Sequence, residues 1–224
     1  MESEKLLKQK IIFHLGQFSR ITSFDEIKET AIPSYIHPNP LVRQIFWRRA
    51  FQIINSVKKC HPASVLDFGG GSGLMLAFFD ASTARFILDI YYAPFDFMKQ
   101  RIDELKNVNK LDNSDTDNLN SDFDVILAAD VLEHFSDDRI KNQLALFHKW
   151  LKPDGHLVIS GPTENLIYKI GRKIAGYKND YHKTNIKNVA DIILKSALFK
   201  LKGKIRYPIP FICEGFWILT YNKV

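Results

Sequence analysis

Seven consecutive residues carry the clearest chemical signal in this 224-residue sequence: Asp67-Phe68-Gly69-Gly70-Gly71-Ser72-Gly73. An apolar run precedes them and another follows, which predicts a glycine-rich turn between a strand and a helix. Glycines in such a turn let a ligand approach the backbone closely, and the first amides of the helix point at it. The turn therefore predicts a nucleotide-type binding site at the carboxyl end of a first strand.

The residue types in the turn favour one kind of ligand. A dinucleotide fingerprint needs a third glycine three residues after Gly71, and Leu74 lies where the glycine pattern breaks. Asp67 places a carboxylate just before the first glycine, where it would repel a pyrophosphate. An acid there suits a ligand that carries an ammonium and a sulfonium. On charge alone, the turn favours S-adenosylmethionine over a nicotinamide dinucleotide.

The elements that must hold this turn alternate along the chain. We predict strands at residues 64–68, 85–90, 108–111, 123–128 and 156–160, and helices at 73–80, 95–106, 138–151 and 186–198, with a polar loop at 113–122. Two strand-like runs, 200–207 and 215–221, follow without a helix between them, which predicts a hairpin. The expected fold is α/β: a doubly wound, mostly parallel seven-stranded sheet with an antiparallel C-terminal hairpin.

The N-terminal region predicts a helical lid. Residues 4–18 have an amphipathic pattern, with Leu7, Ile11, Leu15 and Phe18 on one face. Asn39 followed by Pro40 predicts the start of a second helix that runs to residue 58. Its apolar stripe holds Leu41, Ile45, Ile53 and Val57, and its polar complement Arg43, Arg48 and Arg49. We expect residues 1–58 to form the lid and residues 59–224 the remaining domain, as one structural unit overall.

Taken together, these motifs resemble the class I, Rossmann-like S-adenosylmethionine-dependent methyltransferases of the small-molecule and quinone-biosynthesis type. Residues 65–73 resemble the first motif of that family, and residues 86–90 resemble its second strand with a terminal acid. Residues 123–134 resemble its fourth-strand signature, and residues 151–160 resemble its turn into strand five. The similarity extends from residue 39 to the end of the chain. Four motifs in family order are far more specific than a glycine loop alone.

The resemblance implies S-adenosylmethionine as methyl donor, S-adenosylhomocysteine as product, and a set of cofactor-binding residues. Asp67 and the turn glycines would face the methionine half, Asp89 the ribose hydroxyls, and Ile90 the adenine ring. Asp112 with Asn113 would meet the adenine edge, with Asp115 as the alternative. Ala129 would offer its carbonyl to the cofactor ammonium, while Asp130 is equally a helix cap or a cofactor contact. Arg43 would meet the methionine carboxylate, in competition with Arg48 and Arg49. The full implied set is Asp67, Gly69, Gly71, Gly73, Asp89, Ile90, Asp112, Asn113, Ala129, Asp130 and Arg43.

Methyl transfer from a sulfonium needs alignment and exclusion of water more than covalent help. A base matters only where the acceptor must lose a proton, as a hydroxyl would. The candidates are His134, Tyr181 and His182, although the favoured interpretation is a scaffold residue of its motif for His134 and a solvated loop residue for His182. Residues 161–181 carry basic and aromatic side chains that suit an anionic or partly apolar acceptor.

Composition limits the remaining alternatives. Two distant cysteines, Cys60 and Cys213, predict neither a disulfide framework nor a metal site. No leader or membrane-spanning run is evident, so a cytoplasmic protein is the expectation. The net charge of +6 permits contact with an anionic surface, but the chain has no base-amino motif after strand four, so a nucleic-acid partner is not expected. Three functions stay open: a methyltransferase acting on a small molecule, most readily at oxygen; a lipid or quinone methyltransferase at a membrane surface; and a non-catalytic cofactor-binding partner.

Overall fold

The computed structural model describes residues 2–27, 30–165, 183–209 and 213–224. Seven strands form one sheet in the order β3-β2-β1-β4-β5-β7-β6. Their bounds are β1 Ser64–Phe68, β2 Ala84–Leu88, β3 Val108–Leu111, β4 Phe123–Ala129, β5 Leu151–Pro162, β6 Phe199–Ile209 and β7 Cys213–Lys223. The pairs among β1 to β5 are parallel, whereas β7 pairs antiparallel with both β5 and β6. The predicted mostly parallel sheet with an antiparallel C-terminal hairpin is confirmed.

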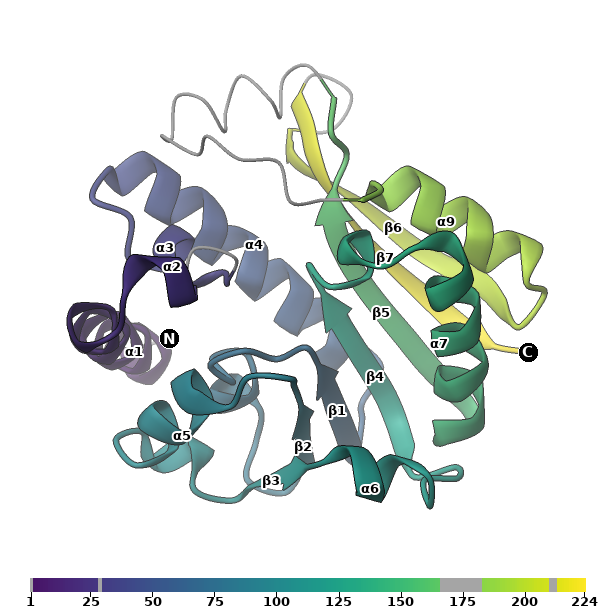
Figure 1. The fold of residues 1–224 in the computed structure, drawn as a ribbon, viewed down its shortest axis with the longest axis horizontal. Coiled ribbons are helices and arrows are strands. Elements are labelled where there is room, and N and C mark those ends of the chain that lie inside the picture. The colour runs from purple at the N-terminus through teal and green to yellow at the C-terminus, as the bar shows by residue number, and fades with distance from the viewer. Residues whose placement is uncertain (1, 28–29, 166–182, 210–212) are drawn as a thin grey trace.

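Helices cover both faces of this sheet (Figure 1). The helices are α1 Glu2–Ile21, α2 Phe24–Ile27, α3 Ile32–Tyr35, α4 Pro40–Lys58, α5 Ala93–Lys99, α6 Asn113–Thr116, α7 Asp137–Trp150 and α9 Ile186–Lys195, with short 3-10 turns η1 Leu76–Phe78, η2 Asp103–Leu105 and η3 Leu132–His134. One apolar cluster joins the N-terminal helices to one face of the sheet, and a second joins α7 and α9 to the other. None of the helices in the described ranges is both long and apolar enough to cross a membrane.

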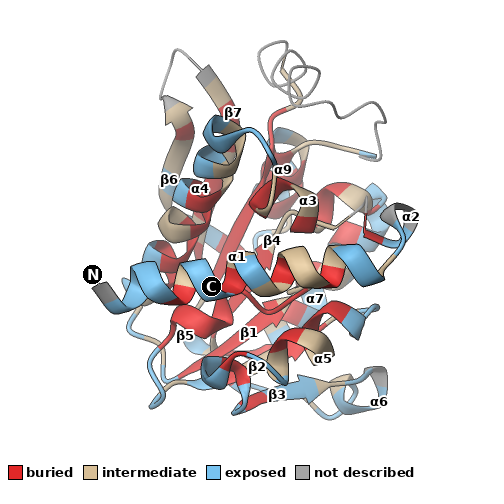
Figure 2. Ribbon diagram, turned by 90° about the vertical axis from the view of Figure 1, so that its left-hand side faces the viewer, coloured by how far each residue is buried: buried red, intermediate tan, exposed pale blue. Residues whose placement is uncertain are grey.

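The N-terminal helix packs with the face that its sequence pattern predicts. Leu7, Ile11, Leu15 and Phe18 are all buried, and they belong to the same cluster as Val65 of β1. Figure 2 shows α1 crossing the front of the molecule, with buried and exposed residues alternating along it. The side chain of Asn39 accepts a hydrogen bond from the Leu41 amide, 2.9 Å away, so the predicted start of α4 is confirmed.

Five local predictions were wrong. Leu41 and Ile45, expected on the apolar stripe of α4, are exposed because the first turns of this helix extend past the core. The helix expected at 73–80 is only the short turn η1. Gly73 has a left-handed backbone, and residues 74 to 79 are all buried, whereas a helix on the surface of the domain would expose one of its faces. The helix expected at 95–106 ends at Lys99, since Ile102 is extended. The expected loop at 113–122 contains α6, which Asp112 caps. Arg49, expected on the polar side of its helix, is fully buried because it pairs with an acid inside the protein.

Candidate functional site

The glycine-rich turn lies where the strand order reverses. β1 pairs with β2 on one side and with β4 on the other, so consecutive connections leave β1 in opposite directions across the sheet. The loops that follow such strands diverge and leave room for a ligand at their carboxyl ends. In Figure 1 the arrowheads of β4 and β5 point to the upper side of the view, where one end of α4 also lies.

Three glycines of the turn, Gly69, Gly71 and Gly73, have left-handed backbones, and the surroundings of the first two differ. Gly69 has φ 71°, and a Cβ built there would overlap the side chain of Val131. Gly71 has φ 55°, and a Cβ built there would have no atom within 4 Å. Gly69 is therefore required by packing within the protein, whereas Gly71 borders open space. The described part of the turn offers that space to a ligand.

Asp89 fixes the turn from the neighbouring strand. Its carboxylate accepts hydrogen bonds from the amides of Gly71 and Tyr91, each at 2.8 Å. The Asp89 amide in turn donates to the hydroxyl of Tyr92 at 3.0 Å, and that hydroxyl donates to the carbonyl of Leu111 at the end of β3. The loops after β1, β2 and β3 are thereby tied together. Sequence reasoning identified Asp89 but missed Tyr92, because a hydroxyl that bridges loop ends leaves no spacing signal.

Ile90 follows Asp89 directly and leaves its side chain 97% exposed. Covering an exposed apolar side chain with a ligand lowers the free energy, because apolar surface is removed from water. The predicted contact with an adenine ring remains a prediction, and the exposure of Ile90 is compatible with it.

Asp67 is a buried acid with an unusual proton affinity. Its side chain is almost inaccessible to solvent, and burial raises the pKa of Asp67 to about 7, with a further contribution from the negative charge of Asp89. Among the residues that the structure describes, neither Asp67 nor Asp89 forms an ion pair. The turn therefore holds two acids that a cationic ligand would neutralise.

Arg49 brings a buried positive charge to the same edge of the sheet. It donates to both carboxylate oxygens of Asp130, one at 3.0 Å, and lies over the rings of Phe216 and Phe46 at 4.1 and 5.2 Å. Asp130 has φ 57° just after β4, and its amide donates to the Ser160 carbonyl at 2.8 Å. Asp130 thus joins α4, β4 and β5. Tyr35 packs in this region, where burial raises the pKa of its hydroxyl to about 12.

Arg43 has a different neighbourhood. Its guanidinium donates to the carbonyl of His37 at 2.8 Å, within the chain that leads into α4. Of the three arginines weighed from the sequence, Arg49 is the one that reaches the end of β4. Helical periodicity favoured a solvent-facing arginine there, and nothing in it signalled a partner 81 residues away in sequence.

The residues after strands three and four lie as follows. The Asp112 carboxylate caps α6 through the amides of Ser114 and Asp115, at 2.9 and 3.2 Å. The hydrogen bond from the Ser114 hydroxyl lowers the pKa of Asp112 most, and the two amides lower it further. Asn113 is the first residue of α6. Ala129 ends β4 opposite Ser160 of β5 and is half-buried. Their predicted cofactor contacts remain predictions.

The third group of predicted residues lies around η3. His134 ends this turn, and the neighbouring Glu133 is fully buried, which raises its pKa well above the ordinary value, with Asp130 adding to the effect. The carbonyl of Glu133 accepts hydrogen bonds from the amides of Lys183 and Thr184, at 2.9 and 3.2 Å. Tyr181 and His182 lie outside the described residues. Within the described ranges, no three His, Cys, Asp or Glu side chains converge to hold a metal ion.

The sequence and the fold were compared with those of known proteins. A family model described as "Methyltransferase domain" matches residues 43–191, more than half of the chain. The comparison with curated proteins gave no match.

Three solved structures illustrate the structural similarity. The N-methyltransferase NodS from Bradyrhizobium japonicum WM9, in complex with S-adenosylhomocysteine, has a TM-score of 0.63 and 16% identity, over 85% of this chain and 91% of that one. Magnesium protoporphyrin IX methyltransferase (ChlM) from Synechocystis PCC 6803, with bound S-adenosylhomocysteine, has a TM-score of 0.60 and 16% identity, over 83% and 88%. A TehB-like methyltransferase from Corynebacterium glutamicum has a TM-score of 0.55 and 18% identity, over 80% and 94%. At these identities the likeness shows a common fold.

Proposed function

We propose that this chain, which belongs to the methyltransferase-domain family, transfers a methyl group from S-adenosylmethionine to an oxygen of a small-molecule acceptor. Membership follows from the family match over residues 43–191, and it agrees with the class I motifs of the sequence. The chain is therefore a methyltransferase, and a non-catalytic partner role is no longer needed to explain it. The choice of an oxygen acceptor is our own proposal.

The observation that carries the cofactor assignment is the pairing of open space at Gly71 with two unneutralised acids. The cofactor is a cation at its sulfonium and its ammonium, which suits Asp67 facing the methionine half, and its ribose hydroxyls suit the acceptor oxygens of Asp89. The open space beside Gly71 would allow the cofactor to lie directly against the backbone of the turn. A nicotinamide dinucleotide would instead bring its pyrophosphate against Asp67.

Each residue of the turn has a task in this proposal. Asp89 would hold the ribose hydroxyls while its existing bond to Gly71 keeps the turn in shape. Ile90 would cover the adenine ring, and Asp112 with Asn113 would meet its edge. Asp67, Gly69, Gly71, Gly73 and Ala129 would face the methionine half.

The carboxylate of the cofactor needs a positive partner. Arg43 is the candidate from the sequence resemblance, and Arg49 is the candidate supported by its place beside Asp130. Both oxygens of Asp130 already accept from Arg49, so Asp130 would hold that guanidinium in position.

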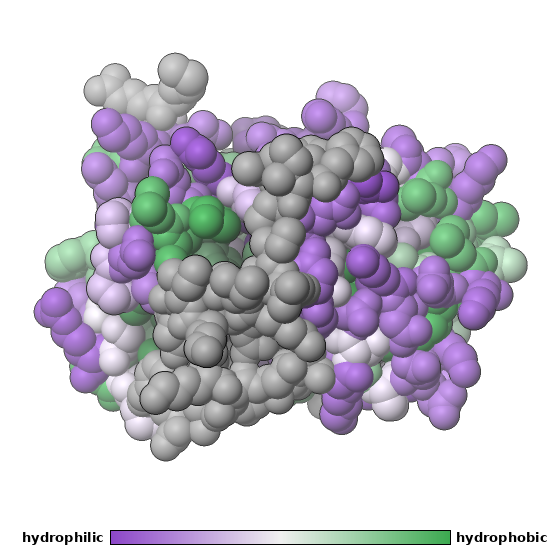
Figure 3. Space-filling model, turned by 90° about the horizontal axis from the view of Figure 1, so that it is seen from above, coloured by the Kyte–Doolittle hydropathy of each residue, from purple (hydrophilic) through white to green (hydrophobic). Residues whose placement is uncertain are grey.

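S-adenosylmethionine supplies a methyl group bonded to a sulfonium, which leaves as a neutral thioether. The chain's part is to align the acceptor oxygen with it, to exclude water, and to take up the proton that a hydroxyl loses. His134, Tyr181 and His182 are the proposed proton acceptors. Figure 3 views the molecule from the upper side of Figure 1 and shows hydrophobic residues among hydrophilic ones on that surface.

A membrane-surface acceptor is the second candidate. It is favoured by the outward face of α1, where Leu6 and Phe13 are 55% and 61% exposed and Lys5 and Lys10 lie nearby in the same helix. Exposed apolar side chains flanked by lysines are typical of helices that bind anionic lipid surfaces.

The Asp89→Ala variant tests the cofactor site by calorimetry with S-adenosylhomocysteine. We expect wild-type binding, and a loss of about 1.5–3 kcal/mol in the variant, the cost typical of hydrogen bonds to a charged group. Asp96→Ala is the matched control, since Asp96 is an exposed acid paired with Lys110 at 2.9 Å. An absence of wild-type binding would overturn the cofactor assignment, and an unchanged dissociation constant in Asp89→Ala would overturn its ribose role.

A further inference from the structure

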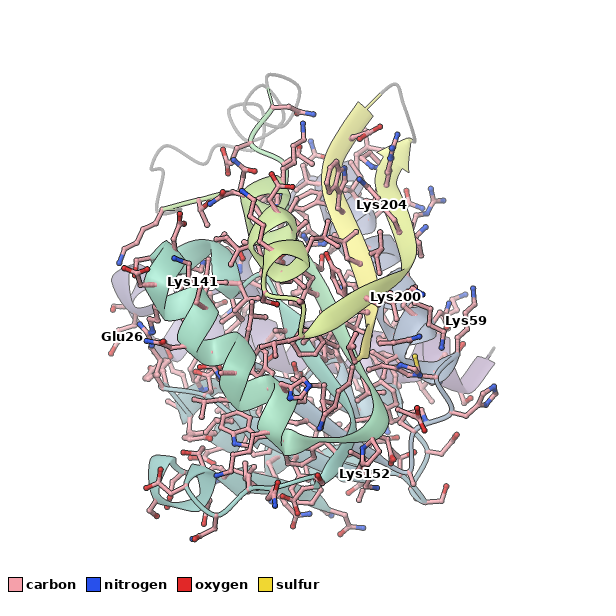
Figure 4. The ribbon with its side chains drawn as sticks, turned by 90° about the vertical axis from the view of Figure 1, so that its right-hand side faces the viewer. Glu26, Lys59, Lys141, Lys152, Lys200 and Lys204 are labelled. Atoms are coloured by element: carbon pink, nitrogen blue, oxygen red, sulfur yellow. The ribbon has the colours of Figure 1, made fainter. Side chains whose placement is uncertain are left out.

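Outside the glycine-rich turn, two lysine side chains from different elements meet at one indole ring, and an arginine lies nearby on one of those elements. Lys204 of β6 places its Nζ 3.0 Å from the centroid of the Trp217 ring, and Lys187 of α9 places its Nζ 5.6 Å from the same centroid. Arg206 lies two residues from Lys204 and is the register partner of Trp217. Figure 4 shows Lys204 on the hairpin, with α9 beside it.

One carboxylate serves this cluster, and its oxygens are already engaged. Glu214 accepts from Arg206 through Oε1 at 3.0 Å and from the Trp217 indole through Oε2 at 3.0 Å. Neither Lys187 nor Lys204 forms an ion pair within the described ranges. Burial lowers the pKa of Lys204, and the charges of Arg206 and Lys187 lower it further, while the carboxylate of Glu214 partly opposes this effect. The two ammonium groups repel each other, and the one nearby carboxylate, that of Glu214, is shared with Arg206 and the Trp217 indole.

Lysines on an edge strand have an ordinary role in preventing strand-to-strand association. Lys200 of the same strand fits that role, because it pairs in register with Asn222 toward the far end of β6. Lys204 differs from it, since it converges on a ring with a lysine from a different element. The convergence, more than the count of lysines, indicates a site.

The cluster adjoins the acceptor side of the proposed active site. The carbonyl of Glu214 accepts from the Thr163 hydroxyl at 2.5 Å and from the Asn165 side chain at 2.9 Å, immediately before residues 166–182. Lys187 lies just beyond the other end of that segment. Phe216, the neighbour of Trp217 in β7, points to the opposite face of the sheet, where it lies against Arg49 of the proposed cofactor site.

We propose that Lys187, Lys204 and Arg206 form an anion-binding site, with Trp217 as its floor, that holds a carboxylate or phosphate group of the methyl acceptor. The proposal rests on the proposed function for the link to an acceptor, although the site itself is defined without it. An anion between the two ammonium groups would form charge-assisted hydrogen bonds and relieve their repulsion. The substrate class is therefore a small acid that carries a methylatable oxygen.

The indole N–H of Trp217 reports on this site by nuclear magnetic resonance. Trp47 and Trp150 are buried and give internal reference signals in the same spectrum. We expect inorganic phosphate, added at constant ionic strength against chloride, to shift the Trp217 signal saturably and to leave the other two in place. Acetate in place of phosphate tests the carboxylate form of the same chemistry.

Lys204→Gln and Lys187→Gln should each weaken the phosphate effect about tenfold, the scale of a lost charge-assisted contact. Lys200→Gln removes the same charge from the same strand and should change the affinity for phosphate less than about twofold. A Trp217 signal whose shift does not saturate with phosphate would overturn the site. So would an affinity for phosphate that falls equally in Lys204→Gln and Lys200→Gln. Calorimetry with S-adenosylhomocysteine should be unchanged in all three variants, which separates failure of this site from failure of the cofactor assignment.

A second measurement connects the anion to the acceptor. Wild type and Lys204→Gln are supplied with radiolabelled S-adenosylmethionine and a small-molecule extract, and the labelled products are separated on an anion exchanger. We expect the retained, acidic products to fall in Lys204→Gln and any neutral products to stay the same. Equal loss of acidic and neutral products would assign the site to a free anion, and an absence of retained products in the wild type would overturn the acceptor assignment.

Discussion

Asp67 combines two properties that seldom occur together at the end of a strand, namely almost complete burial and the absence of a described cationic partner. With its pKa raised to about 7, mainly by burial, the side chain is about half protonated in neutral solution. The bound proton neutralises the same carboxylate charge that a cationic ligand would neutralise. Ligand binding and proton release should therefore be coupled at this residue.

The affinity for S-adenosylmethionine should rise as pH increases from about 5.5 to about 7, because only ionised Asp67 attracts the cation. The slope should approach about tenfold per pH unit at the acidic end and flatten above the pKa of Asp67. The α-amino group of the ligand stays largely protonated over this interval. Calorimetry across the pH range measures the effect, and Asp67→Asn is the control in which the slope should disappear.

The proton on Asp67 opposes ligand binding, but it stabilises the folded protein without ligand. The folded pKa of Asp67 is raised from 3.8, so protonation stabilises the fold below about pH 4, and this contribution is lost as pH rises through about 7. The free energy of unfolding without ligand should thus fall over that interval, less so in Asp67→Asn. A wild-type affinity that is flat from pH 5.5 to 7 would contradict the assignment of Asp67 as a carboxylate facing the cation.

Residues of the site differ in how far the sequence alone identifies them. Asp67 and Asp89 were found because each follows an apolar strand within a recognisable order of motifs. Tyr92 was missed, and Arg49 was only an alternative to Arg43, because their contacts depend on partners distant along the chain: a carboxylate 81 residues away for Arg49 and the Leu111 carbonyl for Tyr92. Sequence spacing reveals contacts within an element or a motif, and tertiary partners lie beyond it.

The turn between β1 and η1 shows how two glycines of one element can be needed for unrelated reasons. Gly71→Ala should leave the protein folded, with a cost of about 1–2 kcal/mol for a left-handed alanine, and should reduce binding of S-adenosylhomocysteine at least about tenfold. The reason is that its Cβ meets only open space in the free protein. Thermal melts and calorimetry on the same sample separate the two effects.

Gly69→Ala should behave in the reverse way, losing stability first because its Cβ overlaps the Val131 side chain. Adding Val131→Ala removes that overlap and should restore part of the lost stability, although the left-handed strain at residue 69 stays. If Gly71→Ala kept full affinity, the turn would not approach the ligand, and the cofactor would have to lie elsewhere.

Regular elements with strong periodicity were predictable from the sequence, and short ones were not. The start of α4 followed from Asn39 and Pro40, whose cap and fixed backbone act locally. The turn after Gly73 was wrongly predicted as a helix because its apolar run satisfies a helical pattern as well as it satisfies complete burial. Only the packing of both sides of that run distinguishes the two.

At the scale of the whole molecule, the N-terminal helices are part of the main core. Ile11 and Leu15 of α1 are fully buried in the cluster that also contains Val65, Val125 and Val158 of the sheet. The division into a lid at residues 1–58 and a domain at 59–224 remains a prediction, and removal of α1 would expose the core as well as any surface function. Tests of α1 should therefore replace its outward residues and keep its inward ones.

That requirement shapes the test of the membrane-surface candidate. Leu6 and Phe13 lie seven residues apart, on one outward face of α1, so Leu6→Ser with Phe13→Ser removes the apolar contact without touching the buried face. If the acceptor is a lipid, wild type should sediment with vesicles that contain anionic lipid, and the double variant should bind at least about tenfold more weakly, since each buried side chain contributes about 1.5–3 kcal/mol. Leu201→Ser, at an exposed leucine of β6, is the matched control and should bind like wild type. Wild type that stays in the supernatant would eliminate this candidate and leave the acceptor among molecules free in solution, where the cationic cluster at Trp217 favours an acid.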